Sequence, residues 1–326
     1  MNTHTDTLTQ DVTSDQVPVP SNTETNSSEA LLNVPNITAP SLASSAMLVA
    51  LSISKWEGKK KDKRASKAVT TNNGAQDGVA NVHKKLLGNC KELQDVLTQG
   101  GKIRNTIHYG MTLPWSDKGT RLLPTAMYFD YTTKMSGAIA EFDTLVSTFL
   151  SAYQWEISQA QAKLGSLFDI TEYPTTDELA SKFNVSLTYT PLPDAGDFRV
   201  DIPNDAMNEI KKTYSDYYSR SISSAMNDIW TRLHEALTRM SERLDYAGKG
   251  DKKTFRDTLV TNVMDIVNIL DKCNLTNDSQ MSACKNKLTD MLYGITPEVL
   301  RESDETRADT KRNIDKVIAS LPSLEV

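Results

Sequence analysis

The side chains best suited to metal binding and nucleophilic chemistry are few and widely spaced in this sequence. They are the histidines and cysteines His4, His83, His108, His234, Cys90, Cys273 and Cys284. No histidine lies three or four residues from another His or Cys, whereas a structural zinc site gathers about four such ligands at short spacing. No His lies near a Cys to make a dyad. The sequence therefore predicts no metal site and no cofactor.

Motifs for nucleotide or acyl chemistry are also missing from the sequence. A phosphate-binding loop needs GxxxxGK followed by Ser or Thr. The glycine pairs at 100–101 and 248–250 lack that spacing, and we predict that they end helices. No GxSxG nucleophile elbow occurs. We therefore expect a non-enzymatic protein, in which any ATP hydrolysis belongs to a partner.

The most suggestive constellation lies in the segment LPWSDKGTRLLP, which holds Trp115, Asp117, Gly119 and Arg121. Gly119 permits a positive φ, Asp117 can close a turn, and Arg121 can pair with Asp117 or with the start of the next helix. The favoured interpretation is an ordered loop that caps a helical core. The functional alternative is a partner-docking surface, because Trp and Arg are frequent anchors of protein interfaces.

The strongest basic cluster follows the first predicted strand, between residues 55 and 67. Its central cations are Lys59, Lys60, Lys61, Lys63 and Arg64. A solvated loop or helix start is the simpler interpretation, and contact with phosphate groups or an acidic partner is the functional one. A second hint of nucleic-acid binding is the group Tyr214, Tyr217, Tyr218 and Arg220, since aromatic rings beside cations hold single strands. At helical spacing these tyrosines are more simply core residues.

Charge and composition divide the chain into a tail and a body. The formal net charge is -6, from 36 basic and 42 acidic residues, and residues 1–40 hold five of the acids and no Lys or Arg. Residues 1–44 are rich in Ser, Thr, Asn and Asp, which predicts a disordered acidic tail. Residues 45–326 are almost neutral and predict a single elongated helical domain.

Hydrophobic periodicity predicts a mainly α fold. Apolar stripes predict helices over 79–99, 125–168, 205–247, 252–272 and 279–293, and a last helix starting near Thr296. Residues 45–56 alternate as a strand, 102–123 are expected to form an irregular ordered loop, and Thr175 with Glu178 has capping-box spacing. A β-hairpin insertion is expected at about 184–203, packed on the long helices or paired with the first strand.

The two longest helices suggest an antiparallel helical hairpin, a coiled-coil stalk with the β-hairpin at its tip and shorter helices packed on it. A compact bundle of kinked helices is the alternative. The longest apolar stretch, 46–51, is far shorter than the ~20 residues of a membrane span, and no secretory signal is present. We expect a cytoplasmic protein, in a bacterial host if the chain is phage-encoded.

Two segments together resemble a known family: LVALSISKWEGKKKDKR at 48–64 and TLPWSDKGTRLLPTAMYFDY at 112–131. They resemble an uncharacterised family of phage and mobile-element proteins, a domain of unknown function. The resemblance covers about 45–320, and its LPW-x-D-x-G-x-RLLP stretch is the specific part. It implies a helical protein encoded near a MoxR-type AAA+ ATPase and a cobalt-chelatase-like protein with a von Willebrand factor A domain. It assigns no catalytic residue.

These observations favour a non-enzymatic interaction protein, an adaptor or accessory subunit of a MoxR-type ATPase system. Its predicted partners are that ATPase and the von Willebrand A protein. One alternative is a nucleic-acid-binding accessory protein in replication or recombination, which would use the basic cluster. Another is a structural or homo-oligomeric assembly protein built by helix packing.

Overall fold

The computed structural model describes residues 43–116, 119–192, 204–245 and 256–322. It is mainly helical with a small antiparallel sheet, as the sequence predicts. Residues 1–42 of the predicted tail and 193–203 of the predicted hairpin lie outside the described residues. No helix within the described ranges is both long enough and apolar enough to cross a membrane.

The four-stranded sheet is built around the predicted first strand. Its strands are β1 (Ala46–Ser54), β4 (Leu113–Pro114), β5 (Thr120–Pro124) and β6 (Asn184–Pro191), in the antiparallel order β4-β5-β1-β6. Val49 of β1 lies opposite Arg121 on one side and Tyr189 on the other. The partner of β6 is thus β1, one of the two placements that the sequence left open.

The helix predicted over 79–99 is wrong in its first half. Over these residues the chain forms β3 (Val82–Lys85), a turn, and then α3 (Lys91–Lys102). The strand β3 pairs with β2 (Lys59–Asp62) as a separate ribbon, and α2 (Lys63–Asn72) connects the two strands. Gly88 has a φ of +61°, which a helix does not allow, and the Cys90 side chain caps α3 by accepting the Leu93 N–H. The apolar spacing predicted a helix here because Leu86 is buried, but this residue lies in a turn, where a side chain can be buried as completely as in a helix.

Gly100 and Gly101 do not end this helix, contrary to the prediction. The helix continues as the π-helix η2 (Ile103–His108) and as α4 (Tyr109–Met111). A Cβ on Gly100 would lie 3.6 Å from the Phe142 ring, an ordinary contact distance, so α3 packs on α5 at this point. The segment 102–123, predicted to be an irregular loop, is therefore mostly helix and strand.

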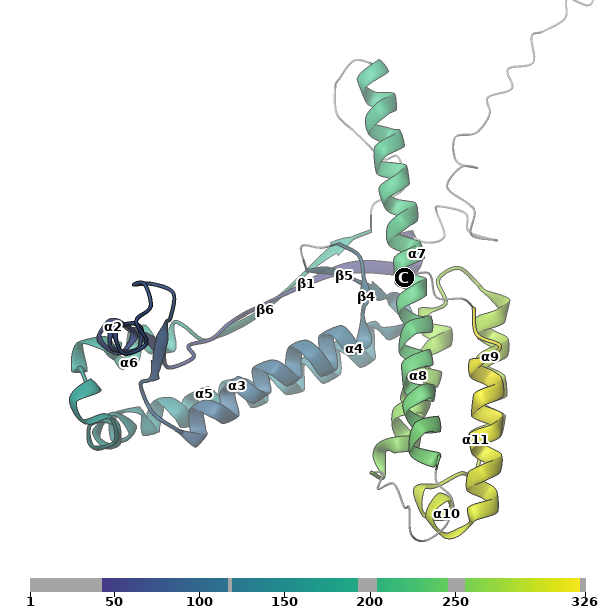
Figure 1. Ribbon diagram of the computed structural model, residues 1–326. Coiled ribbons are helices and arrows are strands. Elements are labelled where there is room, and N and C mark those ends of the chain that lie inside the picture. Colours follow the sequence, from purple (N-terminus) through teal and green to yellow (C-terminus); the bar gives the residue numbers. More distant parts are fainter. Residues whose placement is uncertain (1–42, 117–118, 193–203, 246–255, 323–326) are drawn as a thin grey trace, which may run out of the picture.

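Both long helices are confirmed, with slightly different ends. The first is α5 (Tyr128–Leu164), which follows the 3₁₀ turn η3 (Thr125–Met127), and the second is α7 (Asn204–Leu244). However, α5 packs along α3, whereas α7 packs along α8 and α11 and runs at a steep angle to α5 (Figure 1). A coiled-coil stalk of these two helices is not what the described residues form.

Short elements connect α5 to β6. They are η4 (Gly165–Leu167), η5 (Ile170–Glu172) and α6 (Thr176–Ala180). The predicted capping box is present at the start of α6: Thr175 Oγ1 accepts the Glu178 N–H, and the Glu178 carboxylate accepts the Thr175 N–H. These elements return the chain along the sheet side of α5, which brings β6 to β1.

The C-terminal helices pack against α7 as a bundle. They are α8 (Thr258–Cys273), α9 (Ser279–Leu292), α10 (Pro297–Glu302) and α11 (Asp304–Ile318). The predicted last helix is two helices, because Ser303 interrupts it and its hydroxyl caps α11 through the Thr306 N–H.

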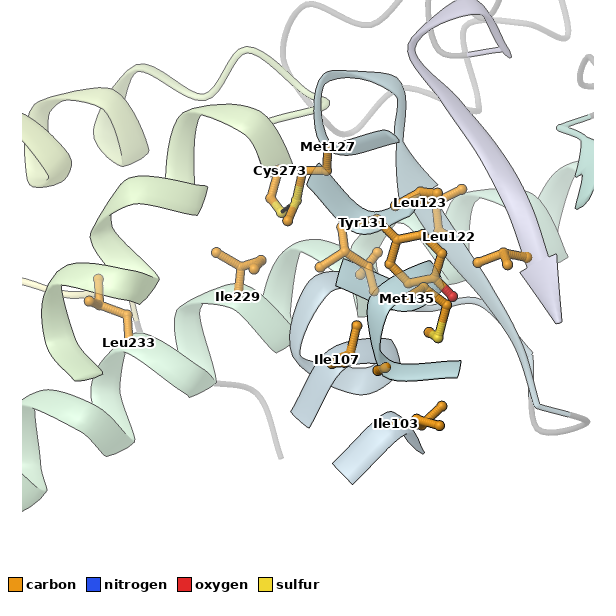
Figure 2. Close-up of a cluster of buried hydrophobic side chains, with 14 of the residues drawn as sticks. Ile103, Ile107, Leu122, Leu123, Met127, Tyr131, Met135, Ile229, Leu233 and Cys273 are labelled. Atoms are coloured by element: carbon orange, nitrogen blue, oxygen red, sulfur yellow. Dashed lines mark hydrogen bonds between the residues drawn. The ribbon is translucent and has the colours of Figure 1, made fainter. Parts of the chain in front are cut away.

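The two halves of the molecule share one hydrophobic core. The arm is made of the sheet with α3 and α5, and the bundle is made of α7 to α11 (Figure 1). Figure 2 shows where they meet: Ile107 of η2 and Tyr131 of α5 approach Ile229 of α7. Cys273 of α8 lies 3.5 Å from Met127 of η3, measured between the two sulfur atoms. Arm and bundle are therefore joined by continuous packing.

Candidate functional site

Trp115 lies inside the molecule, between the sheet and α7. Its side chain is 8% exposed and packs edge-to-face on Tyr218, with 5.4 Å between ring centroids. The Tyr217 hydroxyl and the Ser221 hydroxyl each donate to the Trp115 carbonyl oxygen at 3.2 Å. This placement agrees with the loop-cap interpretation. It also places the Tyr218 ring in the core, since that residue is 4% exposed.

Of the other members of the predicted constellation, the structure describes Gly119 and Arg121. Gly119 has the expected positive φ, +83°, and Asp117 lies outside the described residues. Arg121 is turned toward Thr112: its Nε donates to Thr112 Oγ1 at 2.7 Å and its Nη2 to the Thr112 carbonyl at 2.8 Å. Partner contact through this loop stays a prediction.

A second arginine reaches the same carbonyl from the bundle. Arg232 of α7 donates to the Thr112 carbonyl at 2.9 Å and to the Gly110 carbonyl at 3.1 Å, and it pairs with Asp228 at 2.7 Å. Burial raises the pKa of Asp228, although both arginines oppose that rise. Burial also lowers the pKa of Arg121, and the charge on Arg232 lowers it further. Two cations and one carboxylate thus hold arm and bundle together.

His108 completes this group, which we name the junction cluster: His108, Thr112, Arg121, Asp228 and Arg232. His108 is 1% exposed, and its Nδ1 lies 2.8 Å from the Tyr131 hydroxyl. Its Nε2 has no hydrogen-bond partner within the described part of the chain. Burial, aided by Arg121 and Arg104, lowers the pKa of His108 to about 4, so the ring is neutral at pH 7. Access for a substrate would require opening the core.

A groove of about 820 Å³ borders the junction cluster between α4, α7 and α8. Its charged lining residues are Arg232, Glu235, Arg239, Glu242, Arg243, Arg256 and Asp265. Cations and carboxylates alternate there, and Arg239 is paired with Glu235 at 2.7 Å. No His or Cys is among its described lining residues. The groove therefore offers polar contacts without a nucleophile of those types.

The basic cluster folds into a ribbon that concentrates its charge. Lys59 lies directly opposite Lys85, and Lys61 opposite His83, in the antiparallel pairing of β2 with β3. Residues that lie opposite one another share a face of the ribbon, with their Cβ atoms about 5 Å apart. All four side chains are exposed. We call Lys59, Lys61, His83 and Lys85 the lysine ribbon.

The opposite face of this ribbon is neutralised. Lys84 pairs with Glu172 at 2.6 Å and with Asp62 at 3.6 Å, and its side chain is 8% exposed. Burial acts to lower the pKa of Lys84, but these two carboxylates outweigh it and raise that pKa. A pocket of about 620 Å³ on this side is lined by the remaining predicted cations, Lys60, Lys63 and Arg64, together with the acids Asp62, Asp169 and Glu172.

The sequence indicated the cations of β2, although as a loop or helix start rather than a strand, and gave no indication of their partners on β3. His83, Lys84 and Lys85 were assigned to a helix, which hid their pairing with β2. The junction cluster as a whole gave no sequence signal, because no local spacing joins its three segments, 108–112, Arg121 and 228–232. One further group of potential metal ligands lies close together among the described residues, namely Cys90, Glu92 and Glu156.

Comparison with protein-family models, curated proteins and solved structures found no match to the chain. The resemblance to the phage and mobile-element family therefore stays a prediction.

Proposed function

We propose that this chain is a non-enzymatic nucleic-acid-binding protein and that the lysine ribbon contacts the phosphate backbone. The observation that carries the proposal is the cross-strand pairing of Lys59 with Lys85 and of Lys61 with His83. Lys59 and Lys85 are like charges placed directly opposite each other, an arrangement that destabilises a strand pair. A bound polyanion would relieve that repulsion. The pairing is therefore better explained by a binding surface than by a face that only contacts solvent.

The surroundings of the ribbon support the same proposal. The ribbon packs on α2, whose first turn adds Lys63 and Arg64, both exposed, and α2 lies at the end of the arm away from the bundle (Figure 1). The ribbon carries no Phe, Tyr or Trp. We therefore expect binding through phosphate contacts, which depend on salt and carry little sequence information.

Salt titration of binding tests this proposal quantitatively. The triple variant Lys59→Gln, Lys61→Gln, Lys85→Gln should bind a labelled DNA duplex more weakly at low salt. Each lost phosphate contact lowers the slope of log K against log salt by about 0.9, so the slope should fall by about 2 to 3. The measurement is fluorescence anisotropy across a salt series.

The matched control is Lys134→Gln, Lys182→Gln, Lys287→Gln, which removes the same charge from exposed lysines elsewhere. It should keep the wild-type slope. Equal losses in the two triple variants would mean that only net charge matters, and no binding by the wild-type chain at low salt would refute the proposal.

The second candidate function is the accessory subunit of a MoxR-type ATPase system. One observation favours a protein partner: Phe129 is 80% exposed and stands beside Tyr128, which in turn contacts Tyr189, with ring centroids 5.4 Å and 6.0 Å apart. Exposed aromatic groups of this kind are typical interface anchors. The resemblance, rather than this geometry, is the reason for naming the ATPase.

Affinity capture from native cells tests the second candidate. The tagged chain should retain the ATPase or the von Willebrand A protein, and Phe129→Ser should lose it. Tyr293→Ser, at an 88% exposed tyrosine in the bundle, is the matched control and should retain the partner. Absence of both proteins from the wild-type capture would refute this candidate.

A further inference from the structure

Three potential metal ligands meet where α3 begins against α5. A sulfur of Cys90 and carboxylate oxygens of Glu92 and Glu156 all lie within 4.8 Å of one another. Cys90 is the N-cap of α3, with its Sγ 3.5 Å from the Leu93 nitrogen and 3.5 Å from Glu92 Oε2. The helix start thus fixes two of the three ligands, and α5 brings the third.

Glu156 provides the independent reason to expect a ligand at this place. It is 5% exposed, and its Oε2 is buried and has no hydrogen-bond partner in the described part of the chain. Among the described residues, no Lys or Arg forms an ion pair with Glu156 or with Glu92. A buried carboxylate that lacks a partner is unfavourable, and a proton or a cation would offset that cost.

The position of Glu156 in the sequence is itself unusual. It lies three residues after Tyr153 and four before Ala160, both of which are buried on the inner face of α5. Residues at these spacings share one face of a helix. A carboxylate therefore occupies a position that the helix pattern reserves for apolar residues, and it points toward the Cys90 sulfur rather than to solvent.

We propose that Cys90, Glu92 and Glu156 bind a divalent transition-metal ion of the zinc type, which ties the start of α3 to α5. Zinc accepts both thiolate and carboxylate ligands, whereas calcium and magnesium take oxygen ligands. On binding, the Cys90 thiol loses its proton to water and its sulfur bonds to the metal. Glu92 is half-buried, so a water molecule can reach the fourth position from its side.

Metal titration of the full chain tests this site. Chelator-treated protein should bind one equivalent of Zn²⁺ by calorimetry, and Co²⁺ should give the charge-transfer absorption of a thiolate ligand. Mg²⁺ should not compete. Cys90→Ser and Glu156→Gln should each lower Zn²⁺ affinity at least tenfold and abolish or weaken the Co²⁺ band.

Two controls separate this site from adventitious binding. Cys284→Ser removes another thiol, and Asp143→Asn removes an exposed carboxylate from α5, so both should bind as the wild-type chain does. Glu92→Gln alters the most accessible ligand and is the variant least expected to disturb folding. Zn²⁺ should raise the Tm of the wild-type chain by more than that of Glu92→Gln.

The proposal fails if the wild-type chain binds no Zn²⁺, or if Glu92→Gln and Glu156→Gln bind as tightly as the wild-type chain. It also fails if the Co²⁺ band survives Cys90→Ser and disappears with Cys284→Ser. These outcomes do not depend on nucleic-acid binding, because the lysine ribbon contributes no ligand.

Discussion

The lysine ribbon and the junction cluster place positive charge at two distant parts of the molecule, and they use it differently. At the junction, Arg121 and Arg232 share the Thr112 carbonyl, and Asp228 balances one of the two charges. On the ribbon, Lys59 and Lys85 face each other in solvent, and the one carboxylate near Lys59 among the described residues, that of Glu57, is itself exposed. A guanidinium can satisfy several fixed acceptors at once, whereas a lysine ammonium stays hydrated and available. The junction is therefore suited to holding the fold together, and the ribbon to contacting a partner.

The largest expected effect is the loss of unfolding free energy at acid pH, which we attribute to His108 in the junction cluster. His108 has a folded-state pKa of about 4 and an unfolded value near 6.5, so the fold favours its neutral form. Its contribution is complete above pH 6.5 and is lost as the pH falls toward 4, by about 3 kcal/mol in unfolding free energy. Denaturant unfolding at pH 7 and pH 4 should show this loss.

The comparison uses His108→Gln, which keeps a polar group beside the Tyr131 hydroxyl but does not titrate. Other groups titrate in both proteins, so the quantity that matters is the difference between them. If wild type and variant lose equal stability between pH 7 and pH 4, then His108 is not held neutral by the junction.

The next largest effect should come from removing an arginine of the junction. Arg232→Ala leaves Asp228 and the Gly110 carbonyl without their donor, which should lower the unfolding free energy by roughly 2 to 3 kcal/mol. Arg239→Ala removes only an exposed ion pair with Glu235, so it should cost less than about 0.5 kcal/mol. Urea denaturation measures both, and similar losses would remove the distinction between the half-buried Arg232 and the exposed Arg239.

The smallest effect is expected on the ribbon and has the opposite sign. Lys85→Gln removes the repulsion with Lys59, so stability should rise by roughly 0.3 kcal/mol at low salt. The gain should vanish at high salt, because exposed charges are screened. Lys287→Gln is the control and should change nothing. A ribbon that is destabilised by Lys85→Gln would show that the lysine is structural, and the contrast with the junction would then fail.

The sequence predicted elements better than their partners. The long stripes of α5 and α7, the alternation in β1 and the capping box of α6 are local signals, and all were found. The α3 start was missed, because apolar spacing alone cannot show that Gly88 turns the chain. The packing of α7 on α8 and α11 instead of α5 was missed as well, since a stripe indicates which face is buried but not which helix covers it.

The candidate sites divide in the same way. The cations of β2 were recognised from their density, whereas their cross-strand partners needed the register of β3. The loop of Trp115 was expected to cap the core, but the hydrogen bonds that the Trp115 carbonyl accepts from Tyr217 and Ser221 join positions remote in sequence. Glu156 could have been found from the sequence, because it places a charge on the apolar face of α5. The apolar periodicity used to predict this helix did not include it.

The order of strands in the sheet has a consequence for folding. The central strand β1 pairs with β6, which follows it only after α2, α3 and α5. During synthesis β1 leaves the ribosome long before either of its neighbours, while α3 and α5 can already pack on each other. Such high contact order slows folding and leaves an apolar strand unpaired in the meantime. A nascent chain that stops before β6 would thus present an open sheet edge, a target for chaperones and a starting point for aggregation.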